Sequence, residues 1–374
     1  MDNVKFNKLL NEKYFLLQDI AKKYNYNEEL LDMITYIYIS FYMDFGKNCD
    51  FPLYDLFNKV KVIYDHGTIN DIALKNNFGT MPSGSAAVTI FIPNLNVFKD
   101  ASLKQNPQTI LLGTHVDEYL ATPALKLEML THEVRHALMG YYNTNILLDQ
   151  NTYYMRSGLQ ETYYSRNDNL KEQFTTKKIG TTLDEITNTY ITELLVNRIM
   201  SLKKYRIENS NLRTYLNSIK TSQLDGRYRA IGYNSEVRLL YPLLVNEMFI
   251  NLINQHQFDG KISIIKDFIE SNTDICNYED LCYLLDDVYN GNEKYASEVK
   301  NNNIDFVHNH INNINKAKSI VLEIESKILT KKRWLHTNFV IIVRFVFIFI
   351  VFFIPNIIIL NWFNSFITKY IVSI

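Results

Sequence analysis

The chain has 374 residues, of which 47% are hydrophobic and 21% are charged, and its formal net charge is −1. This composition is ordinary for a folded protein and excludes a disordered chain. The near-neutral charge gives no electrostatic support for nucleic-acid binding. The cysteines, Cys49, Cys276 and Cys282, are too few and too scattered for a disulfide framework or a zinc ribbon, which favours a reducing compartment.

Helical and extended segments are predicted in turn along the chain. Apolar residues recur at helical spacing over the first 45 residues. Two β-type stretches follow, Val60 to Tyr64 and Ala86 to Ile92, and Thr109 to Leu112 is a further candidate strand. Beyond about residue 120 nearly every segment reads as helix, and the clearest helical stretches are 183–206, 236–256, 278–289 and 304–333. Few strands followed by many helices predict a predominantly helical α+β fold with a small sheet.

One predicted helix, between Thr122 and Gly140, carries the sequence His-Glu-Val-Arg-His. Thr122 suits the N-cap, Pro123 the first helical position and Gly140 the C′ position. Residues four apart share a helix face, so His132 and His136 project together. Two imidazoles placed in this way can hold one zinc ion.

Glu133 lies between these histidines and is rotated from His132 by one residue. It therefore points toward the open coordination position of a metal held by the histidines. There it can take a proton from the attacking water and pass it to a leaving amine. The alternative is a pair of exposed or core histidines on an amphipathic helix. The capping signals around the motif favour the metal.

The segment Thr-His-Glu-Val-Arg-His-Ala, residues 131–137, resembles the zinc signature of zincin-type metallopeptidases. The resemblance covers these seven residues. It implies zinc as the cofactor, a small sheet packed on the active-site helix, and a second helix that donates the third ligand. The stretch from Ala86 to Ile92 would then be an edge strand that binds a peptide substrate in extended form.

The third ligand distinguishes subclasses of this family. The metzincin continuation would place glycine at 139 and histidine at 142, whereas this chain has Met139 and Tyr142. The motif therefore resembles the gluzincins, in which a downstream helix supplies a glutamate. The helix predicted at 182–199 offers two candidates, Glu185 and Glu193. They cannot both ligate, because eight residues span about 12 Å along a helix.

Glu185 is the first candidate. Leu-Asp-Glu at 183–185 resembles the Asn-Glu step of gluzincins, although Thr189 stands where that pattern places an acidic residue. A hydroxyl there could still accept an imidazole N–H. The competing interpretation is a capping box, in which Thr182 and Glu185 satisfy backbone groups at the helix start.

Glu193 is the alternative third ligand, with Asn197 one turn further along the same face. The residues alone leave this choice open. If Glu185 ligates, Glu193 is expected to orient a neighbour such as Arg135 or Arg198.

Several further residues are candidates for roles near the site. Tyr233 is a candidate for stabilising a developing oxyanion. His115 lacks ligand spacing and is expected to be a loop residue, whereas His308 and His310 are expected to be solvated side chains of a polar helix. The segment Tyr153 to Arg166 is predicted to be a long connection or lid between the two zinc helices.

The C-terminal part has a different composition. Residues 339–360 are almost wholly apolar and long enough to span a bilayer as one helix, followed by a short tail at 361–374. Basic residues gather just before this run, at 327–333, whereas Lys369 alone follows it. The positive-inside rule then predicts a single-pass membrane protein whose N-terminal domain is cytoplasmic. A buried core helix is the alternative.

The predicted organisation is one zincin-like domain at 1–333, with a helical N-terminal part (1–50), a catalytic core (51–205) and a helical C-terminal part (206–333). The resemblance implies zinc-dependent hydrolysis of peptides or proteins near the membrane. Zinc would be held by His132, His136 and Glu185, with Glu133 as the general base. The alternative function is a non-enzymatic, membrane-tethered helical scaffold with a vestigial or structural metal site.

Overall fold

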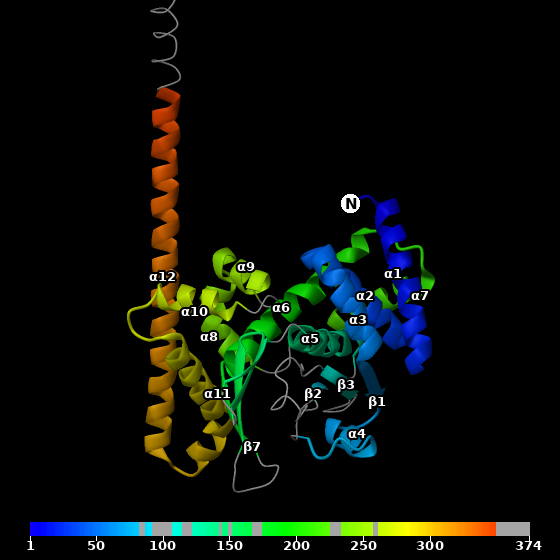
Figure 1. The fold of residues 1–374 in the computed structure, drawn as a ribbon, viewed down its shortest axis with the longest axis horizontal. Coiled ribbons are helices and arrows are strands. Elements are labelled where there is room, and N and C mark those ends of the chain that lie inside the picture. The colour runs from blue at the N-terminus through cyan, green and yellow to red at the C-terminus, as the bar shows by residue number, and fades with distance from the viewer. Residues whose placement is uncertain are drawn as a thin grey trace, which may run out of the picture.

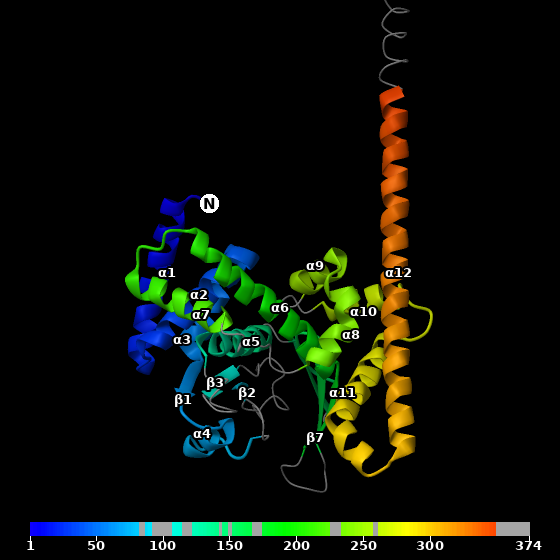
Figure 2. The ribbon, with the colours of Figure 1, turned by 180° about the vertical axis from the view of Figure 1, so that it is seen from behind.

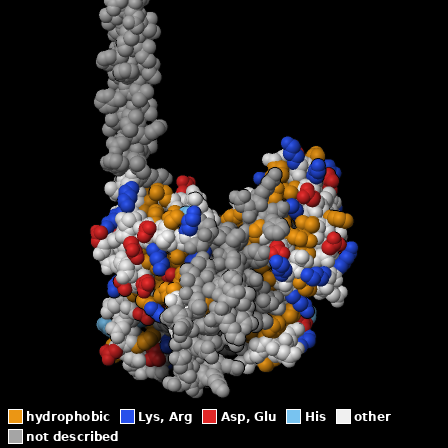
Figure 3. All heavy atoms as spheres, in the orientation of Figure 1, with side chains coloured by type: hydrophobic (Ala, Val, Ile, Leu, Met, Phe, Trp, Pro, Cys, Tyr) orange, Lys and Arg blue, Asp and Glu red, His pale blue; other side chains and the backbone are white. Residues whose placement is uncertain are grey.

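Helices form most of the described chain, and two small sheets lie among them (Figure 1). The computed structural model describes residues 1–81, 87–91, 107–113, 122–141, 144–148, 152–166, 174–224, 233–256 and 261–348. The predicted fold class, predominantly helical α+β with small sheets, is confirmed at this level. On the face shown in Figure 3, side chains of both charge signs are interspersed over the described helices.

The first helices confirm the helical prediction for the N-terminal part. Asp2 caps the first of them and Asn27 the second, each accepting a backbone N–H at 2.8 Å. The second helix is buried along most of its length, so its residues from Leu30 to Phe41 form part of the main core. The helices of this part are α1 (Asn3–Tyr24), α2 (Glu28–Phe45), α3 (Lys47–Lys59) and α4 (Ile69–Lys75).

The first sheet contains the three predicted strands in the order β1-β3-β2. β1 (Lys61–Asp65) runs parallel to the central β3 (Pro107–Gly113), and β2 (Ala87–Phe91) runs antiparallel to it. Side chains of β3 alternate between the two faces: Ile110 and Leu112 join the main core, whereas Leu111 packs against α4. The strand predictions are confirmed. Among the residues that the structure describes, β2 lies at one edge of this sheet.

The second sheet was not predicted. It is an antiparallel meander in the order β4-β5-β6-β7, formed by β4 (Thr144–Leu147), β5 (Thr152–Ser157), β6 (Gln160–Arg166) and β7 (Phe174–Ile179). The segment Tyr153 to Arg166, predicted to be a long connection or lid, instead forms β5 and β6, and the expectation that nearly every segment beyond residue 120 is helical does not hold here. Tyrosine and threonine favour strands. Gly158, with φ +60°, occupies the first position of a two-residue hairpin turn.

The two helices expected to carry the metal site lie at the centre of the molecule (Figures 1 and 2). α5 (Pro123–Tyr141) begins as predicted, since the N–H of Leu125 lies 3.4 Å from the Thr122 hydroxyl. Gly140 lies within this helix, one residue before its end, and not at C′ as predicted. α6 (Thr181–Ser201) ends in a short 3-10 turn.

The remaining helices form the C-terminal half. The predicted helix at 236–256 is divided in two, because the Asn246 side chain accepts the N–H of Met248 and caps a new helix. α12 packs along α11 and α8 (Figure 2). These helices are α7 (Ser210–Leu224), α8 (Asn234–Leu244), α9 (Glu247–His256), α10 (Ile262–Glu270), α11 (Tyr278–Lys300) and α12 (Ile304–Ile348).

The predicted membrane segment begins inside the last helix. α12 extends far beyond the rest of the described structure in both ribbon views. Residues 339–348 form its end, and residues 349–360 lie outside the described residues. Within the part of the chain that is described, no helix has the length and apolar character needed to cross a membrane.

Candidate metal centre

α5 and α6 are joined by buried polar contacts beside the motif. The Arg135 guanidinium donates to the side-chain carbonyl of Asn188 at 2.8 Å, and the Asn188 amide donates to the backbone carbonyl of His132 at 3.2 Å. Both side chains are buried. Burial lowers the pKa of Arg135 to about 10, although the negative charges of Asp184 and Glu185 oppose this effect. Arg135 thus provides a fixed positive charge behind the site.

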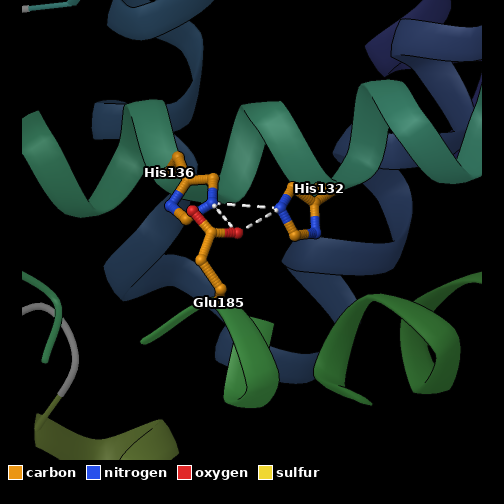
Figure 4. A group of neighbouring side chains, drawn as sticks. All are labelled: His132, His136 and Glu185. Atoms are coloured by element: carbon orange, nitrogen blue, oxygen red, sulfur yellow. Dashed lines mark hydrogen bonds and ion pairs between the residues drawn. The ribbon is translucent and has the colours of Figure 1, made fainter. Parts of the chain in front are cut away.

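The predicted ligands His132, His136 and Glu185 converge between the two helices (Figure 4). Glu185 Oε2 lies 3.1 Å from His132 Nε2 and 3.2 Å from His136 Nε2, and the two nitrogens are 3.0 Å apart. Tetrahedral bonds of 2.0–2.1 Å to zinc would separate ligand atoms by about 3.3 Å. Two histidines and one carboxylate that leave a fourth position open are the donor set of a catalytic zinc site. The residues therefore fit zinc.

The two candidate glutamates of α6 differ in their positions relative to the histidines. Thr182 does not form the predicted capping box with Glu185; its hydroxyl and N–H both contact Asp286 of α11. The Glu185 side chain is turned toward the histidines (Figure 4). Glu193 lies two turns further along α6 and is not part of the cluster, and Arg198 pairs with Asp44 at 2.6 Å.

The carboxylate that supports a histidine is Asp184, which was not among the residues predicted from the sequence. Its Oδ2 lies 3.5 Å from His136 Nδ1, and its Oδ1 accepts the N–H of Leu159 at 2.7 Å. A carboxylate on the second nitrogen fixes the orientation of a ligating imidazole. The residue that orients a ligating histidine was expected one turn after Glu185, at Thr189. The acidic residue in this role instead directly precedes Glu185, in the segment Leu-Asp-Glu.

The charges in the cluster are strongly coupled. Burial disfavours the charged imidazolium of His136, but Glu185 and Asp184 outweigh this effect and hold its pKa well above the ordinary value. Burial also disfavours the Glu185 carboxylate, yet the two histidines outweigh it and hold the Glu185 pKa well below its usual range. The same negative potential that retains a proton on His136 favours a divalent cation.

Glu133 faces the same cavity and is held by the edge strand. The Thr89 hydroxyl of β2 contacts the Glu133 carboxylate at 2.7 Å and its backbone carbonyl at 3.0 Å. Glu133 is 8% exposed. This contact fixes the carboxylate within the cavity that the predicted ligands also line. Thr89 was not singled out from the sequence, because its partner lies 44 residues away.

The cavity around the cluster has a volume of about 630 Å³. Its walls come from β2, α5, α6 and the second sheet, together with Tyr233 and Tyr289. The predicted candidate Tyr233 thus lies at the same cavity as the metal cluster. Its ring stacks on that of Tyr289 with centroids 4.9 Å apart. Burial, then the Glu185 charge, and also a hydrogen bond to Tyr289 raise the pKa of Tyr233.

His308 and His310 do not line this cavity. His308 is exposed as predicted, but His310 is buried, with Nε2 2.9 Å from the Asn292 side-chain oxygen. The expectation of a solvated His310 is therefore wrong; its position between α11 and α12 covers it. His115 lies outside the described residues.

Comparisons with known proteins do not assign the chain to a family. No protein-family model, curated protein or solved structure matches the chain.

Proposed function

We propose that this protein is a zinc-dependent metallopeptidase with a gluzincin-like site. The observation that carries the proposal is the convergence of His132, His136 and Glu185 at 3.0–3.2 Å between two helices. These residues would hold zinc. Zinc in such a site supplies Lewis-acid activation of water and of the scissile carbonyl. The three-residue donor set and the cavity that it lines support a catalytic site more than a closed structural one.

Glu133 is the general base and then the general acid of the proposed reaction. Its carboxylate takes a proton from the attacking water and returns it to the leaving amine. The Thr89 hydroxyl restricts the carboxylate to one orientation, which favours proton transfer along a fixed path. Tyr233 is the proposed donor to the developing oxyanion, because its side chain lines the cavity that the candidate ligands also line.

The substrate is a peptide or protein bound along β2. Ala87, Val88 and Thr89 line the cavity, and β2 is the last strand at its side of the first sheet within the described residues. A peptide added to such an edge binds through main-chain hydrogen bonds. These features support the extended substrate that the zincin resemblance implies.

The direct test is hydrolysis of a peptide library by the zinc-supplemented full chain. We expect internal or terminal peptide cleavage that a chelator abolishes and zinc restores. Glu133→Gln should lower kcat by about 10²–10⁴-fold, because general acid–base catalysis contributes that much. The variant should keep its zinc, since Glu133 is not a ligand. Full activity in this variant would exclude the mechanism.

A non-enzymatic scaffold with a structural metal site is the competing function. It predicts bound zinc without hydrolysis of any library peptide, and Glu133→Gln would then change neither property. The cavity beside the cluster and the buried carboxylate of Glu133 within it favour the enzyme.

We propose that a C-terminal segment at 339–360 anchors this domain to the membrane, with the domain on the cytoplasmic side. Its composition and the basic residues at 327–333 support this location. An anchored chain stays with the membrane pellet after alkaline extraction, and release into the supernatant would refute the anchor.

A further inference from the structure

The second sheet turns one of its two faces toward the cavity of the metal cluster. Met155, Thr162 and Lys178 are directly opposed across β5, β6 and β7, so their side chains lie on the same face. Ser157 and Gln160 are opposed in the same way, two residues further along their strands, and belong to this face as well. All of these residues except Thr162 line the cavity. This face is therefore one wall of the cavity.

The opposite face of the second sheet contacts α10 and α11. Glu161 of β6 pairs with Lys266 of α10 at 2.7 Å. The ammonium of Lys177 on β7 lies 5.7 Å from the centroid of the Tyr283 ring of α11. Consecutive residues of a strand point to opposite faces. Of two adjacent lysines, Lys177 thus contacts a neighbouring helix, whereas Lys178 faces the cavity.

Lys178 is the one lysine or arginine among the described residues that line the cavity. The acidic residues of the lining are Glu128, Glu133, Asp184 and Glu185. Glu133, Asp184 and Glu185 each contact other described side chains. The Lys178 side chain is exposed, and no hydrogen bond or ion pair joins it to another described residue. Its ammonium is therefore accessible to an anionic group of a ligand in the cavity.

Lys178 is close to the metal cluster along the chain. It stands three residues before Thr181, the first residue of α6, which is at most about 11 Å for an extended chain. Glu185 lies about 6 Å further along the helix. The α-carbons of Lys178 and Glu185 are thus at most about 17 Å apart. Because an extended peptide advances about 3.3 Å per residue, Lys178 can reach substrate groups up to about five residues from the scissile bond.

We propose that Lys178 is a specificity-determining residue that binds a carboxylate of the peptide substrate. A lysine ammonium forms charge-assisted hydrogen bonds with a carboxylate. The carboxylate belongs to an acidic side chain or to the C-terminus of the peptide, two sources that share this chemistry. Lys178 selects the peptide and takes no part in breaking the bond. This inference rests on the proposed peptidase function.

The test compares peptides that differ by one charge. A library with free and with amidated C-termini first gives the best-cleaved sequence for the zinc-supplemented full chain. Glutamate, glutamine or lysine is then placed in turn at each of the five positions on either side of the scissile bond. We expect one carboxylate to raise kcat/KM by about three- to tenfold over its neutral counterpart, since water screens an ion pair at an exposed lysine. A preference for glutamate in amidated peptides assigns the side chain, and a preference for the free end alone assigns the C-terminus.

Lys178→Gln should abolish this preference, and Lys178→Glu should reverse it toward lysine or toward the amidated end. Lys177→Gln is the matched control, because it removes the same charge from the adjacent residue on the other face of β7. It should keep the full preference, and equal melting temperatures of the two glutamine variants would show that both fold.

The proposal is overturned if no carboxylate is preferred, if the preference persists in Lys178→Gln, or if both glutamine variants lose it equally. Chelator-sensitive cleavage of neutral peptides would in each of these cases leave the peptidase function standing. If no peptide is cleaved in a chelator-sensitive manner, the peptidase function itself fails and the role of Lys178 fails with it.

Discussion

The orientation of the proposed ligands depends on side chains outside the zinc motif. Asn188 joins α6 to the backbone at His132, and Asp184 contacts the second nitrogen of His136. Asp184 also accepts the N–H of Leu159, so one carboxylate joins the histidine to the turn between β5 and β6. Buried polar groups with such fixed partners have little freedom to reorient. The cluster is therefore preorganised by its surroundings.

Asp184→Asn tests this support at the scale of one residue. The amide keeps the shape and can still accept from Leu159, but it loses the charge beside His136. Loss of an outer-shell partner typically weakens metal affinity by about 10–100-fold. Competition with a chromophoric chelator measures this change. Asp287→Asn, at an exposed position of α11, is the control. Equal zinc affinity of the two variants would argue against the role of Asp184.

The local part of this site was predictable from the sequence. His132, Glu133 and His136 share one turn of a capped helix, and their relative positions follow from helical periodicity alone. The contacts of Asp184 and Asn188 depend on how two helices pack together, and the Asn188 contacts join residues 53 and 56 positions apart in the chain. No periodicity within α6 encodes that packing. Glu185 could be proposed as the third ligand from the sequence. The alternatives, ligation by Glu193 and a capping-box role for Glu185, could not be distinguished without the packing of α6 against α5.

At the scale of elements, the second sheet is the main departure from the sequence prediction. Its strands lie between α5 and α6, and its β5–β6 turn packs directly on Asp184. The alternation in Thr-Tyr-Tyr-Met-Arg-Ser is weak because both faces of β5 carry tyrosine or other large side chains. Gly158 between two such segments was the available signal for a hairpin. The first sheet was predictable because its strands are short, apolar and bounded by turn residues.

Gly158→Ala tests the link between this turn and the metal centre. An added Cβ would lie 2.4 Å from Asp184 Oδ1 and 2.7 Å from Met139 Sδ, in a backbone with φ +60°. We expect weaker zinc binding and a loss of about 1–3 kcal/mol in the free energy of unfolding. Gly46→Ala is the control, because Gly46 also has a positive φ, +62°, and an added Cβ there would meet nothing within 4 Å among the described residues. It should lower stability through backbone strain but leave zinc affinity unchanged; the hypothesis fails if both variants lower that affinity alike.

At the scale of the whole molecule, a buried carboxyl in the N-terminal helices is expected to make stability depend on pH. Asp32 of α2 is 5% exposed. Burial, and then the charges of Glu28 and Glu29, raise its pKa to about 7. The folded protein therefore keeps a proton that the unfolded chain releases near pH 4. The resulting stabilisation is complete below the unfolded pKa and is lost as pH rises through about 7.

Asp32→Asn should remove this dependence. Its free energy of unfolding should exceed that of the native protein at pH 8 by about 1 kcal/mol, allowing for solvent screening, and the difference should shrink toward pH 4. Urea unfolding at several pH values measures it. Taking the difference between the two proteins cancels the titration of the metal-site histidines. A difference that is constant with pH would contradict the raised pKa of Asp32.

The central claim is that one zinc ion is held by His132, His136 and Glu185, and zinc affinity tests it most directly. Glu185→Gln and Glu193→Gln are matched changes on one helix, two turns apart. The structure predicts that Glu185→Gln weakens zinc binding by about 100-fold or more, since an anionic ligand is lost, whereas Glu193→Gln binds like the native protein. Loss of zinc from Glu193→Gln with retention by Glu185→Gln would contradict the account.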